Sequence, residues 1–289
     1  MLNSFRLDRL ITLYGLVPFL SHQWARKPFL PILMYHSISD DPENGVHGYY
    51  RLNTSIARFR EQMFWLKEHG YATVNLAEGL KYLKINNTNQ IGSDQNRKVV
   101  LTFDDGYADF LTNAWPILAE LDMSATVYLP TSFIGKQSKI FKGRKCLTWR
   151  QVLELYDQGI FLGTHTANHV QLHDLSWPDI EKELLDSRRC LENQLGHPVH
   201  EFAYPYAYPS ADHSFCKRLN TSLQSCGYQY GVNTMIGTVT YGDDNMRLKR
   251  LPVNDADDMT FFKAKLEGMY NWLETGQKTV KAVKNLIHF

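Results

Sequence analysis

Short apolar runs alternate with amphipathic segments along most of this chain. The apolar runs are rich in β-branched and aromatic residues, which favour buried strands. The predicted strands are 31–36, 73–74, 99–103, 125–129, 160–162, 202–204, 228–232 and 248–253. Between them, apolar residues recur at spacings of three and four, as at Ile56, Phe59 and Met63, which predicts helices with one buried face. The predicted helices are 55–69, 76–83, 108–121, 150–157, 176–195, a mixed helix ending near 225, and 257–274.

This alternation predicts the fold class α/β. Parallel strands joined by helices form either an open doubly wound sheet or a barrel, with the helices outside. With 289 residues and 44% hydrophobic content, the chain can bury one substantial core, so we expect a single domain. The asparagine-rich stretch 86–96 is a predicted surface loop.

Residues 1–30 form an N-terminal extension to this pattern. Their apolar part, 10–20, is shorter than the about 20 residues that span a bilayer as a helix. The residues after it lack a small-x-small cleavage site and turn basic, so we expect a cytoplasmic protein. A peripheral position at the inner membrane is a further option. The segment is either an amphipathic helix on a membrane surface or, as we favour, a helix packed on the domain.

Charge is balanced over the chain and basic only locally. Thirty-one basic and thirty acidic side chains give a formal charge of +1, which argues against a nucleic-acid partner recruited by bulk charge. The tail 276–289 carries lysines at spacings of three beside apolar residues, which indicates a basic amphipathic helix, solvated in the simplest interpretation. The four cysteines have no Cys-x-x-Cys spacing, which favours a reducing compartment over a zinc knuckle or a disulfide framework.

Two adjacent carboxylates follow the strand predicted over 99–103. Successive strand side chains face opposite sides, so Asp104 and Asp105 can share a task only where the strand breaks into a loop, and Gly106 permits that break. One carboxylate could then bind a cation while its neighbour handles a proton. Alone, this segment is more typical of a solvated Asp-Gly turn.

A histidine pair follows the apolar run 160–162. His165 and His169 lie on one face if their segment makes a single helical turn, so both imidazoles can reach one ion. Two histidines and one carboxylate form a common open ligand set for a divalent metal. The spacing alone is a weak signal among eleven histidines, but an Asp-Asp strand end and a histidine pair at a second strand end are a much stronger combination.

Three segments resemble the motifs of a known family. The segments 102–106 (Thr-Phe-Asp-Asp-Gly) and 165–169 (His-Thr-Ala-Asn-His) are similar to the first two motifs of the polysaccharide deacetylases, the NodB-homology carbohydrate esterases of family 4 type. The segment 202–207 resembles the next motif, and all three come in the family's order. The resemblance covers roughly 31–253 and implies a catalytic domain over 31–275 with the family's irregular (β/α)-barrel. In barrels of this kind, active residues lie at the carboxyl ends of strands.

The resemblance implies a metal-dependent hydrolase that removes acetyl groups from N-acetylated sugars of a polysaccharide or a lipid-linked saccharide. Asp105, His165 and His169 would hold a divalent ion, with zinc expected and cobalt, nickel or iron as alternatives. Asp104 would accept the proton of the attacking water. The backbone N–H of Tyr206 would meet the oxyanion.

His36, at the end of the first predicted strand, is the candidate general acid. A lone histidine after a strand is most often a structural residue. Many members of the family carry their acid histidine late in the chain, in a Leu-x-His-type motif, whereas the poly-N-acetylglucosamine deacetylases carry it early. We find no late candidate among the remaining histidines, so His36 resembles the early acid and the chain is nearest that branch.

The chain departs from the family pattern at two positions. Ala203 stands where many members have an arginine that orients the catalytic aspartate, and Arg250 could reach in instead or could be a surface arginine. Ala207 replaces the usual glycine of the third motif, which puts the conformation of that loop in question. Tyr107 and Tyr204 suit a sugar ring, although tyrosines also fill barrel mouths structurally. Tyr107, Tyr204 and Arg250 are therefore the predicted substrate-binding residues.

Two other classes of function stay open at this stage. An O-acetyl esterase or a cyclic-amide hydrolase could use the same scaffold, and a catalytically silent carbohydrate-binding module could keep the fold. The intact Asp-Asp and His-x-x-x-His segments argue against the silent module, while Ala203 and the missing late histidine are compatible with it. The expected partner is an N-acetylated saccharide of an exopolysaccharide or cell-envelope glycan, with peripheral contact to a membrane or lipid-linked glycan as an option.

Overall fold

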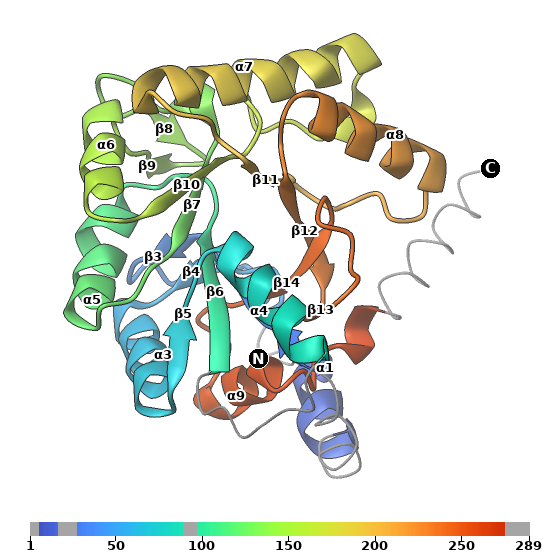
Figure 1. The fold of residues 1–289 in the computed structure, drawn as a ribbon. Helices are drawn as coiled ribbons and strands as arrows, with labels where there is room; N and C mark the ends of the chain where they lie inside the picture. The colour runs from blue at the N-terminus through green and yellow to red at the C-terminus, as the bar shows by residue number, and fades with distance from the viewer. Residues whose placement is uncertain (1–5, 17–27, 89–96, 275–289) are drawn as a thin grey trace.

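The structure, a computed structural model, describes residues 6–16, 28–88 and 97–274 (Figure 1). Within these residues, seven parallel strands close into a barrel. Around the ring they follow the order β2 (Ile32–Tyr35), β14 (Leu248–Pro252), β12 (Tyr230–Ile236), β11 (Glu201–Ala203), β10 (Phe161–Thr164), β7 (Thr126–Leu129) and β6 (Arg97–Phe103). Because β6 pairs again with β2, with Tyr35 opposite Phe103, the ring is closed. An eighth strand, β5 (Tyr71–Thr73), pairs with the start of β6. The prediction of a single-domain (β/α)-barrel is confirmed.

Helices connect the strands and surround the barrel (Figure 1). They are α3 (Ile56–Glu68), α4 (Leu76–Thr88), α5 (Trp115–Glu120), α6 (Trp149–Asp157), α7 (Trp177–Leu195), α8 (His213–Ser225) and α9 (Met259–Leu266). Several starts are fixed by side chains that accept a backbone hydrogen bond in the first turn of the helix. These capping residues are Ser55, Thr148, Asp212 and Asp258.

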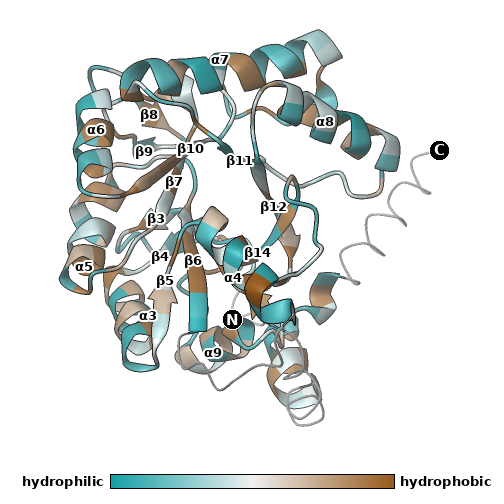
Figure 2. Ribbon diagram, viewed as in Figure 1, coloured by the Kyte–Doolittle hydropathy of each residue, from teal (hydrophilic) through white to brown (hydrophobic). Residues whose placement is uncertain are grey.

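The wall of the barrel is buried on both faces. Every residue of β2 and β7 is buried, because one face of each strand packs inside the barrel and the other packs under helices. Figure 2 shows hydrophobic residues concentrated on strands such as β6, β7 and β10, whereas α7 is mainly hydrophilic. Burying one large aliphatic side chain stabilises the fold by about 1.5–3 kcal/mol. The strand ends are therefore held by a continuous core.

Short elements that the periodicity did not predict complete the fold. The described residues include three small two-stranded sheets, formed by β1 (Phe29–Leu30) with β13 (Val239–Thr240), β3 (Ser37–Ile38) with β4 (Asn53–Thr54), and β8 (Ile140–Phe141) with β9 (Arg144–Lys145). There are also two single helical turns, η5 (Thr131–Phe133) and η6 (Leu172–Asp174). Elements of two or three residues are too short to carry a hydrophobic period.

Two predicted helices differ from the structure. The helix predicted over 108–121 starts as a π-helical segment, η4 (Phe110–Ala114), and continues as α5, which has Pro116 in its first turn. Proline has no backbone N–H to continue a regular helical ladder. The prediction of one helix over 257–274 is wrong, because α9 ends at Leu266 and Gly268 follows with a φ of 77°.

The described part of the N-terminal extension packs against the last helical region. It forms α1 (Leu7–Leu10) and a π-helical segment, η2 (Ile11–Leu16). Tyr270 donates a hydrogen bond to Asp8, and the indole N–H of Trp272 donates to Thr12 at 3.0 Å. The predicted basic tail 276–289, most of the predicted loop 86–96 and the residues 17–20 of the apolar N-terminal stretch lie outside the described residues. None of the helices in the described ranges is long and apolar enough to cross a membrane.

Candidate active site

The predicted catalytic and metal-binding residues gather at one end of the barrel. His36 directly follows β2, Asp104 and Asp105 follow β6, and His165 follows β10. Because the barrel strands are parallel, their carboxyl ends meet at the same rim.

Asp105, His165 and His169 form a buried ligand set. Their candidate ligand atoms all lie within 4.8 Å of one another. Oδ1 of Asp105 is 3.0 Å from Nε2 of His169 and 3.6 Å from Nε2 of His165. The ring Nδ1 of His165 lies 2.8 Å from the carbonyl oxygen of Ala203, and since a carbonyl only accepts, Nδ1 carries the hydrogen. The lone pair of Nε2 is thereby directed at the cluster, which is how ligand histidines are usually oriented.

The electrostatics of this cluster fit a divalent ion. Oδ1 of Asp105 is buried and has no hydrogen-bond partner among the described residues. Burial raises the pKa of Asp105, but the close His169 and the other positive neighbours outweigh burial and hold the pKa below its ordinary value. Burial lowers the pKa of His165 to about 4, so this imidazole is neutral at pH 7, as a metal ligand has to be. A buried carboxylate oxygen without a hydrogen-bond donor, beside the neutral imidazole of His165 and the ring of His169, is a set that a cation completes.

The histidine segment is a loop and not the helical turn that the spacing predicted. Thr166 and His169 have φ values of 60° and 52°, which a right-handed helix excludes. The loop is held by Glu183 of α7, whose carboxylate accepts hydrogen bonds from the backbone N–H groups of Ala167 and Asn168 at 3.0 and 2.9 Å. The helical turn that would place both rings on one face does not form, and the loop brings both imidazoles to Asp105 instead.

Asp104 is paired with Arg250 from β14. Two guanidinium nitrogens of Arg250 donate to the two carboxylate oxygens of Asp104, each at 2.7 Å. The fully buried arginine also donates to the carbonyl oxygen of Asn233 at 3.0 Å and to Oγ1 of Thr102 at 3.2 Å. Burial raises the pKa of Asp104, but the attraction of Arg250 outweighs it, so the pKa lies below its ordinary value. Arg250 is therefore placed to orient the carboxylate of Asp104, which the alanine side chain at position 203 cannot do.

The structure corrects all three predicted substrate-binding residues. Arg250 is enclosed and its donors are used by protein acceptors, so it cannot meet a substrate. Tyr204 is buried in the wall, where its hydroxyl donates to the carbonyl oxygen of Met246 at 2.7 Å. Tyr107 is also buried, and its hydroxyl donates to Oδ2 of Asp105 at 2.9 Å. Tyr107 therefore orients a candidate metal ligand.

His36 lies beside the aspartate pair. Its Nε2 is 4.0 Å from Oδ2 of Asp104, and its side chain keeps 14% exposure. Burial lowers the pKa of His36, although the negative charge of Asp104 opposes that shift. A group placed in this way can reach the same bound molecule as Asp104.

The loop after β11 presents Tyr206 to the cluster. Tyr206 has a φ of 57°, the residue is 47% exposed, and its ring centroid lies 4.7 Å from that of His169. Thr234 of β12 fixes the loop on both sides, because its hydroxyl donates to the carbonyl oxygen of Tyr206 at 2.9 Å and accepts from the N–H of Tyr208 at 3.1 Å. In the described residues, none of the hydrogen bonds uses the backbone N–H of Tyr206. Ala207 is accommodated in this loop without a glycine.

Thr234 and Lys142 belong to the site although the sequence did not single them out. The signal for Thr234 was a polar residue inside an apolar strand, and the signal for Lys142 was a Lys-Gly turn between two short segments. The ammonium of Lys142 lies within 3.5 Å of both Asp105 and His169.

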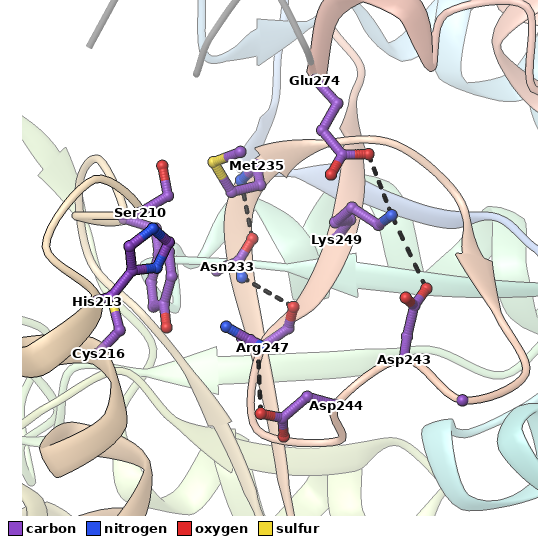
Figure 3. A pocket seen from close by; sticks show the side chains of 12 residues that line it. Ser210, His213, Cys216, Asn233, Met235, Asp243, Asp244, Arg247, Lys249 and Glu274 are labelled. Atoms are coloured by element: carbon purple, nitrogen blue, oxygen red, sulfur yellow. Dashed lines mark hydrogen bonds and ion pairs between the residues drawn. The ribbon is translucent and has the colours of Figure 1, made fainter. Parts of the chain in front are cut away.

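A cavity of about 310 Å³ lies elsewhere, beside β12 and β14 (Figure 3). Its charged side chains bind one another: Nζ of Lys249 is 3.1 Å from Glu274, and Arg247 contacts Asp244 at 3.2 Å. None of the metal-site residues lines this cavity. The chemistry of the described chain is therefore concentrated at the barrel rim.

Comparison with known proteins agrees with this geometry. The family model described as polysaccharide deacetylase matches residues 92–231, which include the Asp-Asp pair, both histidines and Tyr206. YxkH of Bacillus subtilis, provisionally named a polysaccharide deacetylase, is 28% identical over 240 residues, or 83% of this chain and 77% of the relative. The poly-β-1,6-N-acetyl-D-glucosamine N-deacetylase of Staphylococcus epidermidis is 29% identical over 208 residues, covering 68% of this chain and 67% of the relative. The solved deacetylase PplD of Streptococcus pyogenes, in complex with acetate, is 26% identical, has a TM-score of 0.68, and matches 83% of this chain and 99% of its own. Over most of its length, this chain is similar to polysaccharide deacetylases.

Proposed function

We propose that this protein is a metal-dependent hydrolase that removes acetyl groups from N-acetylated sugars in a polysaccharide. The observation that carries the proposal is the juxtaposition of a buried Asp-His-His ligand set with a second, arginine-paired aspartate. The first can hold a divalent ion and the second can move a proton, and hydrolysis of an acetamide needs both functions.

Asp105, His165 and His169 are the residues that would hold the ion. The buried, partnerless Oδ1 of Asp105 and the oriented Nε2 of His165 support this assignment. When bound, a divalent ion supplies a Lewis acid that lowers the pKa of water and polarises a carbonyl group. Zinc is the ion we expect, and cobalt, nickel and iron are alternatives for the same ligand set.

Asp104 is the proposed general base. The two hydrogen bonds from Arg250 keep its carboxylate ionised and fix the plane of the group. An ionised and oriented carboxylate can take the proton of an attacking water, for which general-base catalysis contributes about 10²–10⁴-fold. Arg250 acts here through Asp104 and makes no contact with the substrate.

His36 is the proposed general acid. An amine anion cannot leave the acetyl carbon unaided, so the sugar nitrogen has to receive a proton as the bond breaks. His36 lies 4.0 Å from Asp104, close enough for both residues to serve one acetamide group. Burial lowers the pKa of His36, and the adjacent carboxylate of Asp104 opposes that shift and favours the protonated imidazolium that a general acid needs.

The loop at Tyr206 would stabilise the developing negative charge. Its backbone N–H makes none of the protein hydrogen bonds in the described ranges and can donate to an oxyanion at the rim. The half-exposed ring of Tyr206 adds an aromatic face beside His169, of the kind on which a sugar ring packs. The relative from Staphylococcus epidermidis supports a polymer of N-acetylglucosamine as the first substrate to test.

The test is metal restoration with a matched inactive variant. We would strip the protein with a chelator, restore zinc, cobalt, nickel or iron singly, and measure free amine and acetate released from short β-1,6-linked N-acetylglucosamine oligomers. Wild type should regain activity with at least one ion, and Asp104→Asn should bind that ion while releasing amine about 100-fold more slowly or worse. Metal binding without any release from N-acetylated sugars would reject the proposal, and acetate without amine from O-acetylated sugars would replace it with an esterase.

A further inference from the structure

A lysine at the tip of the β8–β9 hairpin reaches the candidate metal ligands. Lys142 and Gly143 form the two-residue turn of this hairpin, with φ values of 48° and 79°, the backbone that a tight hairpin turn of this kind needs. Nζ of Lys142 lies 3.3 Å from Nε2 of His169 and 3.5 Å from Oδ2 of Asp105. The ammonium therefore contacts two of the three residues that would hold the ion.

The hairpin itself is firmly anchored. Arg144 donates to Ser37 at 2.7 Å and to Asp41 at 2.8 Å, both in the segment that follows β2. The carbonyl oxygen of Lys145 accepts a hydrogen bond from the backbone of Ala108 at 2.8 Å. Because these contacts hold β9 in place, the part of the turn with the most rotatable bonds is the four-carbon side chain of Lys142, which is 35% exposed.

The ammonium and a divalent ion need the same lone pair. A neutral imidazole has one lone pair, and with Nε2 of His169 turned toward the cluster, that lone pair either accepts from Lys142 or binds an ion. Two cations held within a few ångströms also repel each other, and this repulsion is strongest in a buried site. Simultaneous occupation by the ammonium and the ion is therefore excluded.

We propose that Lys142 is a built-in competitor of the divalent ion, displaced from Asp105 and His169 each time the ion binds. This inference rests on the metal site of the proposed function. The displaced side chain has an adjacent place to go, because Nζ already lies 4.7 Å from the ring centroid of Phe141 and 5.4 Å from that of Tyr206. Lys142 thus lowers the affinity of the site for the ion and balances the charge of Asp105 when the ion is gone.

The experiment measures metal affinity without substrate. Zn²⁺ and Co²⁺ affinities would be determined by competition with a chromophoric chelator for wild type, Lys142→Met, Lys142→Arg and Lys145→Met. Methionine keeps the length of the side chain and the same Cβ at the positive φ, so the turn is not altered. Lys145 is the matched control, since it lies on the same hairpin and its loss changes the net charge equally. Circular dichroism would verify that every variant is folded.

Lys142→Met should bind both ions about three- to fivefold more tightly than wild type, the upper part of the range that a partly exposed ion pair supports. Lys142→Arg and Lys145→Met should stay within about twofold of wild type. Unchanged or weaker binding by Lys142→Met would overturn the inference, as would an equal gain for Lys145→Met, which would assign the effect to overall charge. If wild type binds neither ion, both the metal site of the proposed function and the role of Lys142 are rejected. If all variants bind the ions equally tightly, only the role of Lys142 as a competitor is rejected.

Discussion

The barrel rim and the cavity beside β12 both collect charged side chains, but they differ in how those charges are satisfied. In the cavity, Lys249 lies between Asp243 and Glu274, at 3.8 and 3.1 Å (Figure 3). At the rim, Oδ1 of Asp105 and Nδ1 of His169 are buried with no hydrogen-bond partner among the described residues.

Whether the charged side chains are paired distinguishes a structural region from a candidate catalytic site better than the volume of the cavity does. Leaving a buried polar atom without a partner costs about 1–3 kcal/mol, so unpartnered oxygen and nitrogen atoms gathered among potential metal ligands indicate a place for a ligand. The cavity has volume but its charges neutralise one another across short distances. The rim has unsatisfied ligand atoms, and it is the rim that carries the motifs of the family.

Removing Arg250 should have the largest effect of the variants that test this comparison. Arg250→Met leaves Asp104 buried without its cation, which costs about 3–5 kcal/mol of folding free energy when one partner of a buried pair is lost. Amine release should fall at least about 100-fold, because the proposed base loses its charge and its orientation. Urea denaturation and the amine assay would measure the two losses. As a control, Arg247→Met removes a half-exposed contact to Asp244 and should cost less than about 1 kcal/mol.

The same variant predicts a change in pH dependence. In the wild type, the pKa of Asp104 is lower in the folded protein than its ordinary value, so the pair contributes stability above that value, and the contribution is lost as pH falls through the folded pKa. Without Arg250, burial is opposed only by His165 and His36, so the pKa of Asp104 rises. Protonation of Asp104 should then stabilise Arg250→Met as pH falls, whereas the wild type loses the stability of its ion pair in acid. The difference in unfolding free energy between the two proteins should therefore narrow in acid, in urea denaturations followed by circular dichroism at each pH. A difference that stays constant with pH would contradict the pairing.

Thr234 should have an intermediate effect, confined to turnover. Thr234→Val keeps the shape of the side chain but removes the hydroxyl that holds the carbonyl of Tyr206 and the N–H of Tyr208. We expect kcat to fall about tenfold, since a misaligned oxyanion donor weakens the transition state, while KM and metal affinity stay within about twofold. Thr234→Ser should restore most of kcat. A loss that serine does not restore would mean that packing, and not the hydroxyl, is what the loop requires.

The fold followed from local patterns because the barrel strands are short, apolar runs separated by amphipathic helices. The pattern failed where apolar residues continue beyond the helix that carries them. Met269 is buried like the residues of α9, yet it lies past Gly268, whose positive φ ends the regular run. The sequence also offered no sign of the positive φ at Thr166 and His169 that makes the histidine segment a loop.

The site was only partly predictable, for a related reason. Asp104, Asp105, His165 and His169 lie next to strand ends, and parallel strands bring such residues together whatever the details of packing. The pair between Asp104 and Arg250 depends on the placement of β14 and β6 in the closed ring, which no local pattern reveals. The burial of Tyr107 and Tyr204 depends on that packing as well. The roles assigned to the site residues, the domain boundaries, the cytoplasmic location and the membrane contact stay predictions.

The smallest effect is expected in the cavity. Lys249→Met removes a partly exposed ammonium from between Asp243 and Glu274, and water can hydrate both carboxylates because each keeps about a quarter or more of its side chain exposed. Stability should fall by less than about 1 kcal/mol, and amine release should stay within about twofold of wild type. The two would be measured with the same denaturation and amine assays. A tenfold loss of release with stability intact would place the cavity on the path of the substrate, and paired charges would then no longer distinguish a structural region from a catalytic one.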